Sequence, residues 1–177
     1  MFIPGFLIAL VTFPGVIVHE AAHQFFCKRN GLAVMEVCYF RIGNPAGYVI
    51  HEATTAFRPM WMVAMGPFFV NTALCVFFCS AAFIPVSVLG VDDPLGVLFM
   101  WLGLSIGMHA IPSSQDMKGI WRLMPAEARR GNALAVVSYP IVGLVHVLNA
   151  LQVLWADLIY AVLAGVFLPW ALFKAIV

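Results

Sequence analysis

The sequence of 177 residues is 63% hydrophobic and only 10% charged, with a net charge of +1 at pH 7. A soluble domain of this size has too little interior to bury so much apolar surface, so the composition excludes a soluble globular protein. The near-neutral charge, without a basic run or a Gly-rich phosphate loop, argues against a nucleic-acid partner. The apolar stretches are helix-length, and we therefore expect an all-α polytopic integral membrane protein whose main surroundings are the lipid bilayer.

About five apolar stretches approach the roughly 20 residues that a helix needs to cross a bilayer. They cover residues 2–26, 59–84, 94–111, 132–151 and 154–176. The first contains Pro14-Gly15, which predicts a kink. We expect residues 1–120 to form a three-helix core and residues 121–177 to form a cytoplasmic segment and two C-terminal spanning helices.

Residues 28–58 are too polar to span and form an insert between the first two spans. Two runs rich in strand-forming residues, 33–41 and 48–51, flank the turn sequence Gly43-Asn44-Pro45-Ala46-Gly47. They predict a small β-hairpin or sheet. Two interpretations stay open: an edge strand that binds an unwound peptide by strand addition, or a structural cover.

The charged residues predict the orientation through the positive-inside rule. The basic residues that mark two loops as cytoplasmic are Lys28, Arg29, Arg41, Arg58, Lys118, Arg122, Arg129 and Arg130. Asp92 and Asp93 mark the loop after the second span as external, and Lys174 closes the chain on the inner side. We expect the N-terminus outside and the C-terminus in the cytoplasm, with a prokaryotic cytoplasmic membrane as the location.

The motif His19-Glu20-Ala21-Ala22-His23 lies inside the first apolar stretch. Histidines four residues apart share one helix face, so both can bind one metal ion, and Glu20 can reach a water held by that metal. This is the H-E-x-x-H arrangement of zinc metalloproteases. Ionisable groups at membrane depth are costly and indicate function. The less favoured alternative is a pair of buried histidines that neighbouring helices satisfy.

A catalytic zinc usually takes three protein ligands and leaves one position for water. The acids that the predicted orientation places on the wrong side of the membrane are Asp92, Asp93 and Asp157. The stretch from His109 to Asp116 ends the third span on the motif's side, and Pro112 breaks the helix there. We therefore predict one Zn²⁺ per chain, with Asp116 as the third ligand beside His19 and His23.

Three features together resemble the site-2 protease family, the intramembrane zinc metalloproteases. They are His19-Glu20-x-x-His23 in a spanning helix, Gly66-Pro67-x-x-x-Asn71 in the second span, and Pro112 followed by Asp116. The resemblance covers roughly the first 120 residues, which corresponds to the family's three-helix catalytic core. It implies that Asp116 ligates zinc, that Glu20 is the general base and that Asn71 lies near the site.

The sequence departs from the family pattern around the third ligand. His109 stands where the family has an Asn before the proline, and Asp116 comes slightly early and is followed by Met117-Lys118 instead of a glycine. His109 could donate a hydrogen bond to a developing oxyanion or compete as a ligand, and Asn71 is the other candidate for the oxyanion.

These observations predict a zinc metalloendopeptidase that hydrolyses membrane-anchored protein substrates near the cytoplasmic leaflet, with Glu20, His109 and Asn71 as catalytic residues. One alternative is a zinc-binding membrane scaffold, or pseudoprotease, without proteolytic activity; the intact Glu20 argues against it. A metal transporter would need ionisable residues along several spans, and the last two spans offer few. A purely structural membrane protein would bind no metal. The sequence indicates no oligomeric state.

Overall fold

The structure, a computed structural model, describes residues 5–89 and 94–176. Its helices are α1 (Gly5–Val11), α2 (Phe13–Arg29), α3 (Phe57–Leu89), α4 (Pro94–Met108), α5 (Ser114–Arg129), α6 (Ala133–Ala150), α7 (Ala156–Val162) and α8 (Leu168–Ile176). A 3₁₀ turn, η1 (Leu151–Leu154), and a π-helical turn, η2 (Leu163–Phe167), interrupt the last helices. Phe2, Asp92 and Asp93, on which the first span and the external loop were predicted, lie outside the described residues.

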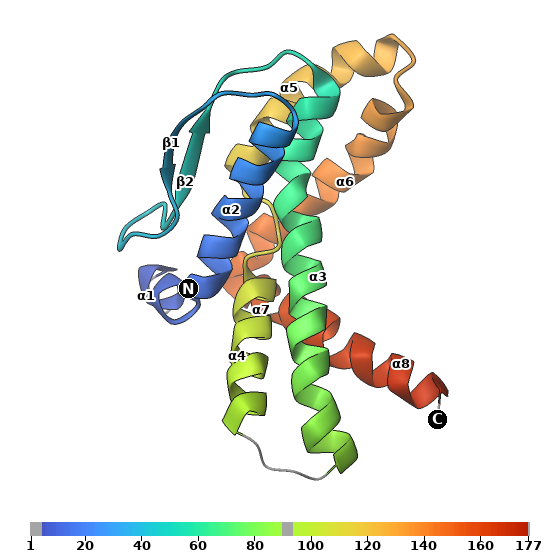
Figure 1. Cartoon of the computed structure of the whole chain (residues 1–177). Helices are drawn as coiled ribbons and strands as arrows, with labels where there is room; N and C mark the ends of the chain where they lie inside the picture. The colour runs from blue at the N-terminus through green and yellow to red at the C-terminus, as the bar shows by residue number, and fades with distance from the viewer. Residues whose placement is uncertain (1–4, 90–93, 177) are drawn as a thin grey trace.

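Helix α3 is the long central element, and helices α2, α4, α5 and α8 pack against it (Figure 1). Its 33 residues rise about 50 Å, more than the roughly 30 Å of a bilayer's hydrocarbon core. Helix α2 lies along its N-terminal half, and α4 and η2 lie along its C-terminal half. Glycines allow α4 and η2 to approach α3 closely, because a Cβ at Gly103 of α4 or at Gly165 of η2 would lie 2.4 or 2.7 Å from the Cys79 Sγ.

The amphipathic helix α5 packs beside the N-terminal half of α3 and completes the apolar core there. Met117, Ile120 and Met124 recur on one face of α5 and are fully buried against α3 and α6. Lys118 and Arg122 lie on its exposed face. This division between faces explains why the segment folds as a helix although its sequence is too polar to span.

The prediction of about five spans is not confirmed. Within the described residues, three helical stretches are long and apolar enough to cross a membrane: 57–82, 133–154 and 156–175. A fourth is present only if α1 and α2 count as one span, and they meet at 88°. Helix α4 is apolar but has only 15 residues. The structure is therefore compatible with a membrane protein of three or four spans.

The first predicted span is bent earlier and more sharply than its proline suggested. The break lies at Thr12, whose hydroxyl donates to the Ile8 carbonyl at 2.7 Å and whose backbone ends α1. Pro14 then sits in the first turn of α2, where no helical N–H is needed. Gly15 permits close helix contact, because a Cβ there would lie 2.1 Å from the Ser105 carbonyl oxygen of α4.

The predicted β-hairpin is confirmed. Strands β1 (Val34–Cys38) and β2 (Tyr48–His51) pair antiparallel, with Cys38 opposite Tyr48 and an irregularity between Val34 and Glu36. The hairpin lies beside α2 (Figure 1), so its connecting loop can approach the helix that carries the H-E-x-x-H motif.

Candidate metal centre

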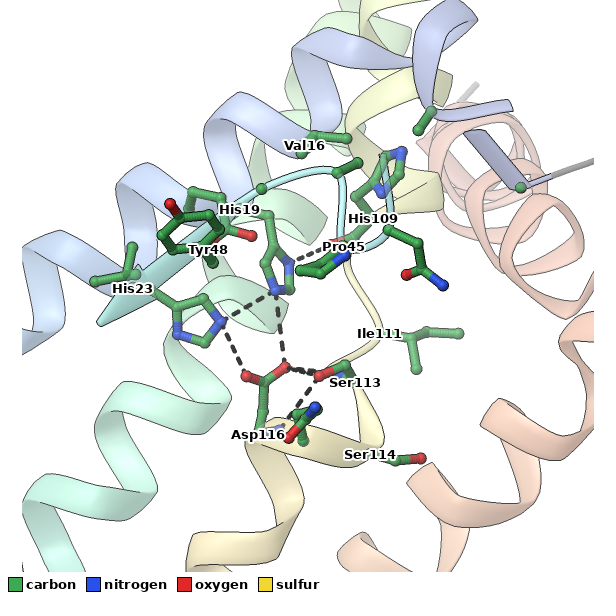
Figure 2. Close-up of a pocket in the computed structure, with 18 of the residues that line it drawn as sticks. Val16, His19, His23, Pro45, Tyr48, His109, Ile111, Ser113, Ser114 and Asp116 are labelled. Atoms are coloured by element: carbon green, nitrogen blue, oxygen red, sulfur yellow. Dashed lines mark hydrogen bonds and ion pairs between the residues drawn. The ribbon is translucent and has the colours of Figure 1, made fainter. Parts of the chain in front are cut away.

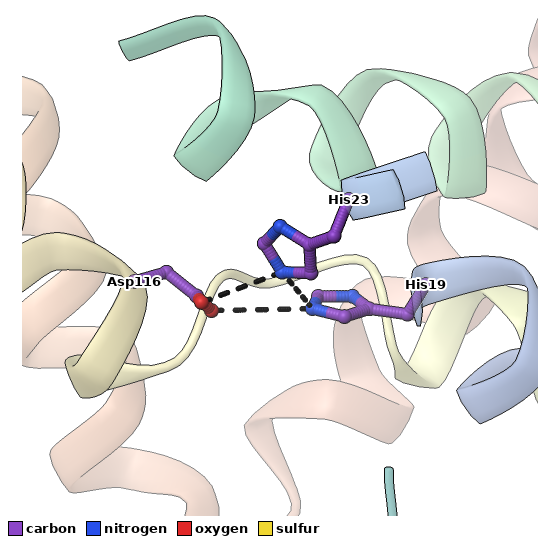
Figure 3. A group of neighbouring side chains, drawn as sticks. All are labelled: His19, His23 and Asp116. Atoms are coloured by element: carbon purple, nitrogen blue, oxygen red, sulfur yellow. Dashed lines mark hydrogen bonds and ion pairs between the residues drawn. The ribbon is translucent and has the colours of Figure 1, made fainter. Parts of the chain in front are cut away.

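His19 and His23 of α2 and Asp116 of α5 bring three ligand atoms together (Figure 3). The two Nε2 atoms lie 3.1 Å apart, and the His23 Nε2 lies 3.3 Å from Asp116 Oδ1. The His19 Nε2 lies 3.9 Å from the other carboxylate oxygen. Ligand atoms around a tetrahedral zinc are about 3.3 Å apart, so these spacings suit one ion of that size.

The hydrogen bonds of the two histidines fix which ring nitrogen of each is free to bind an ion. His19 Nδ1 lies 2.6 Å from the His109 carbonyl oxygen, and His23 Nδ1 lies 2.9 Å from that of Val63. A carbonyl can only accept, so each Nδ1 must carry the proton. In neutral histidines both Nε2 atoms then present lone pairs to each other, an arrangement that a shared cation stabilises. The donor set could therefore hold a metal ion.

Each accepting carbonyl is available because the sequence breaks a helical hydrogen-bond ladder nearby. Pro67 has no N–H and cannot donate to Val63, four residues before it, so that carbonyl is left for His23. His109 follows the end of α4, where the last carbonyls lack helical partners and Pro112 prevents continuation. The Gly66-Pro67 pair also brings α2 close, because a Cβ at Gly66 would lie 2.0 Å from the Phe26 ring.

Asp116 is held by the start of its own helix. Ser113 is the N-cap of α5, and its hydroxyl accepts from the Asp116 backbone N–H. In return, the backbone N–H and the hydroxyl of Ser113 both donate to Asp116 Oδ2 at 2.7 Å. This capping box restrains the carboxylate and leaves Oδ1 toward His23. Ser113 was not predicted, although Ser-x-x-Asp before an apolar helix face is the sequence signal of such a cap.

Glu20 is buried, with 8% of its surface exposed, and it lines the same cavity as the three ligands. Its carboxylate has no hydrogen-bond partner among the described residues. The hairpin loop covers it, because a Cβ at Gly47 would lie 2.7 Å from the Glu20 Cγ. Within the part of the chain that the structure describes, Glu20 is thus a carboxylate without a hydrogen-bond partner beside the candidate metal site.

The ring of His109 lies outside the metal group (Figure 2). Its Nε2 is 2.8 Å from the Thr12 hydroxyl, and since that hydroxyl donates to Ile8, the ring nitrogen is the donor. The contribution of His109 to the site is its backbone carbonyl, which orients His19. The prediction that its side chain acts on an oxyanion is not tested by this arrangement.

Asn71 is fully buried between three segments. Its Nδ2 lies 3.3 Å from the Gly15 carbonyl oxygen and 3.1 Å from those of Ile106 and His109, while its Oδ1 has no partner among the described residues. Asn71 therefore links α2 and α4 and holds the same carbonyl that orients His19. Its predicted catalytic role likewise stays a prediction.

The three ligands and Glu20 open on a cavity of about 1420 Å³ (Figure 2). Tyr48 and His51 of β2 line one wall, and the Tyr48 hydroxyl donates to the Glu36 carboxylate, which raises the Tyr48 pKa. Asp157 lines the cavity as well. The side of the membrane on which Asp157 lies stays a prediction, but the chain after η1 brings its side chain to the same cavity as the motif.

Comparison with protein-family models, with curated proteins and with solved structures gives no match. The resemblance to the site-2 protease family consequently depends on the motif residues, and the interpretation of the site depends on its geometry.

Proposed function

We propose that this protein is an intramembrane zinc metalloprotease that hydrolyses peptide bonds of membrane-anchored proteins. The observation that carries the proposal is the convergence of His19, His23 and Asp116 beside the unpartnered carboxylate of Glu20 in one cavity. Two imidazoles and one carboxylate are a ligand set of catalytic zinc, with one position left for water. The H-E-x-x-H spacing favours zinc over other divalent metals that accept the same donors.

The roles of the residues follow from their positions. Zinc bound there would polarise the scissile carbonyl and lower the pKa of water. Glu20 accepts the proton of the attacking water on its carboxylate and passes it to the leaving amine. The hydrogen bonds from the histidines to the Val63 and His109 carbonyls hold both rings in the ligating orientation throughout.

The substrate must reach the cavity as an unwound peptide. A substrate helix bonds its own amides internally and must open before the scissile bond can reach Glu20. The basic residues of the insert that carries the β-hairpin, Lys28, Arg29, Arg41 and Arg58, are consistent with a site toward the cytoplasmic side of a prokaryotic membrane. We propose that the protein cleaves membrane-anchored substrates near the inner leaflet and that residues 1–120 form its catalytic core.

The proposal is tested by metal analysis and cleavage on the detergent-purified full chain. We expect about one zinc per chain, lost or much weakened in Asp116→Ala, and cleavage of a fluorogenic membrane-anchored substrate. Glu20→Gln should keep the zinc and lose the cleavage, because it removes the base and no ligand. A wild-type protein without bound metal after metal-replete purification contradicts the proposal.

The same experiment separates the nearest alternative. A zinc-binding membrane scaffold would hold zinc through the same three ligands, and Glu20→Gln would leave every measured property unchanged. If iron or another metal is found in place of zinc, the ligand set stands and the assignment to zinc metalloproteases is wrong.

A further inference from the structure

The cavity has a second polar region on the wall that the C-terminal helices form. Asn149 of α6, Gln152 of η1 and Asp157 of α7 line it together with the metal group. Among the described residues that line the cavity, the ionisable side chains are acids, histidines and a tyrosine, with no lysine or arginine. Asp157 is therefore a carboxylate on an apolar helix, and no lysine or arginine among the described lining residues can pair with it.

These three side chains form one hydrogen-bonded chain that reaches the segment carrying the third ligand. Asn149 Nδ2 donates to the Pro112 carbonyl at 3.1 Å, next to the Ser113 cap of α5. Gln152 Nε2 donates to Asn149 Oδ1 at 3.2 Å and to Asp157 Oδ1 at 3.4 Å. Figure 2 shows the segment from His109 to Ser113 beside His19, and the bond from Asn149 to Pro112 ties the second polar region to this segment.

The hydrogen-bond pattern decides which chemistry this region can still accept. Both Nε2 hydrogens of Gln152 are used inside the chain of contacts, which leaves Gln152 Oε1 and Asp157 Oδ2 without donors among the described residues. What remains is acceptors, one of them on a carboxylate. A partly buried carboxylate is costly unless a cation or several donors approach it.

We propose that Asn149, Gln152 and Asp157 form a substrate subsite that accepts a lysine or arginine side chain of the cleaved segment. The ammonium or guanidinium group supplies the donors that Gln152 and Asp157 lack, and its aliphatic stem suits the apolar remainder of the cavity. This inference rests on the proposed function, and it adds a substrate class to it: membrane segments with a basic residue near the scissile bond.

The test is a binding measurement that does not require turnover. The zinc-loaded Glu20→Gln chain in detergent is titrated with fluorescein-labelled peptides of about 20 apolar residues, identical except for one position that holds lysine, norleucine or glutamate. We expect the lysine peptide to bind roughly tenfold more tightly than the norleucine peptide, and the glutamate peptide to bind most weakly. Norleucine keeps the aliphatic stem, so the ratio reports the charge.

Asp157→Asn in the same background should bring the lysine-to-norleucine ratio close to one, because it removes the charge and keeps a side chain that can bond Gln152. Glu127→Gln, the same chemical change at the end of α5 and away from the cavity lining, should keep the wild-type ratio. Equal affinities in the parent chain, or a lysine preference that survives Asp157→Asn, overturn the subsite. If lysine peptides bind as expected and the wild type cleaves none, the subsite stands and the protease proposal fails.

Discussion

Replacing Pro67 with alanine should weaken metal binding while it stabilises helix α3. An alanine at this position supplies an N–H that bonds the Val63 carbonyl within the helix, in competition with His23 Nδ1, now 2.9 Å from the same oxygen. Loss of an outer partner of a metal ligand costs about 10- to 100-fold in affinity. Because a carbonyl has two lone pairs and His23 can keep part of its bond, we expect about tenfold, or 1.4 kcal/mol.

The two effects have opposite signs, which distinguishes positioning of a ligand from general damage. Proline inside a helix costs about 3 kcal/mol, so Pro67→Ala should raise resistance to denaturant in detergent. Metal affinity is measured by competition with a chromophoric chelator. Pro59→Ala is the matched control, since Pro59 lies in the first turn of the same helix, where the backbone N–H has no helical acceptor. Unchanged zinc affinity in Pro67→Ala refutes this account of the Gly66-Pro67 pair.

Two further substitutions test the covering loop and the buried amide. Gly47→Ala should push the hairpin loop off Glu20 and reduce cleavage at unchanged zinc content. Gly43→Ala is the control and should behave as wild type, because its new Cβ would lie 3.8 Å from the Arg41 side chain. Equal cleavage rates in the two variants would show that the contact between the loop and Glu20 is irrelevant. Asn71→Leu should lower zinc affinity by about tenfold, because the His109 carbonyl that orients His19 loses its bond from Asn71. Thr72→Val is the control: it loses the bonds to Phe68 and Tyr160 and should keep the wild-type zinc affinity. Zinc affinity is measured by competition with a chelator, and equal losses in both variants would mean general destabilisation.

The grouping of His19, His23 and Asp116, which could hold a metal ion, was predicted from the sequence through local patterns. Helical spacing places His19 and His23 on one face, and the break at Pro112 allows Asp116 to turn back toward them. The hairpin was predictable for the same reason, since strand-forming residues flank a turn sequence. Each of these patterns is local, whereas the meeting of Asp116 with the two histidines more than 90 residues before it depends on how α5 packs beside α2 and α3.

The rest of the site depends on contacts that no residue type signals. The carbonyls of Val63 and His109 orient the two ligands, and backbone groups leave no mark in a sequence beyond the prolines that release them. The place of Asp157 beside the cavity was not predicted, because hydropathy treats each apolar stretch as a full crossing and says nothing of where its ends pack. The turn at η1 and the left-handed Trp155 after it bring Asp157 to the cavity.

A last prediction follows from the cost of leaving a largely buried carbonyl without its donor. His23→Ala removes the donor to Val63, while His19→Ala leaves the His109 carbonyl bonded to Asn71 at 3.1 Å. In metal-free protein, His23→Ala should therefore lose about 1 kcal/mol more stability than His19→Ala.

A double-mutant cycle separates this effect from the loss of packing. In a Pro67→Ala background the new N–H satisfies Val63, so the excess cost of His23→Ala should disappear, whereas the cost of His19→Ala should not change. The measurement is the free energy of unfolding in detergent with a chelator present. If His23→Ala costs the same free energy of unfolding in both backgrounds, His23 stabilises the metal-free protein by packing alone. In that case the missing N–H of Pro67 does not explain how His23 is oriented.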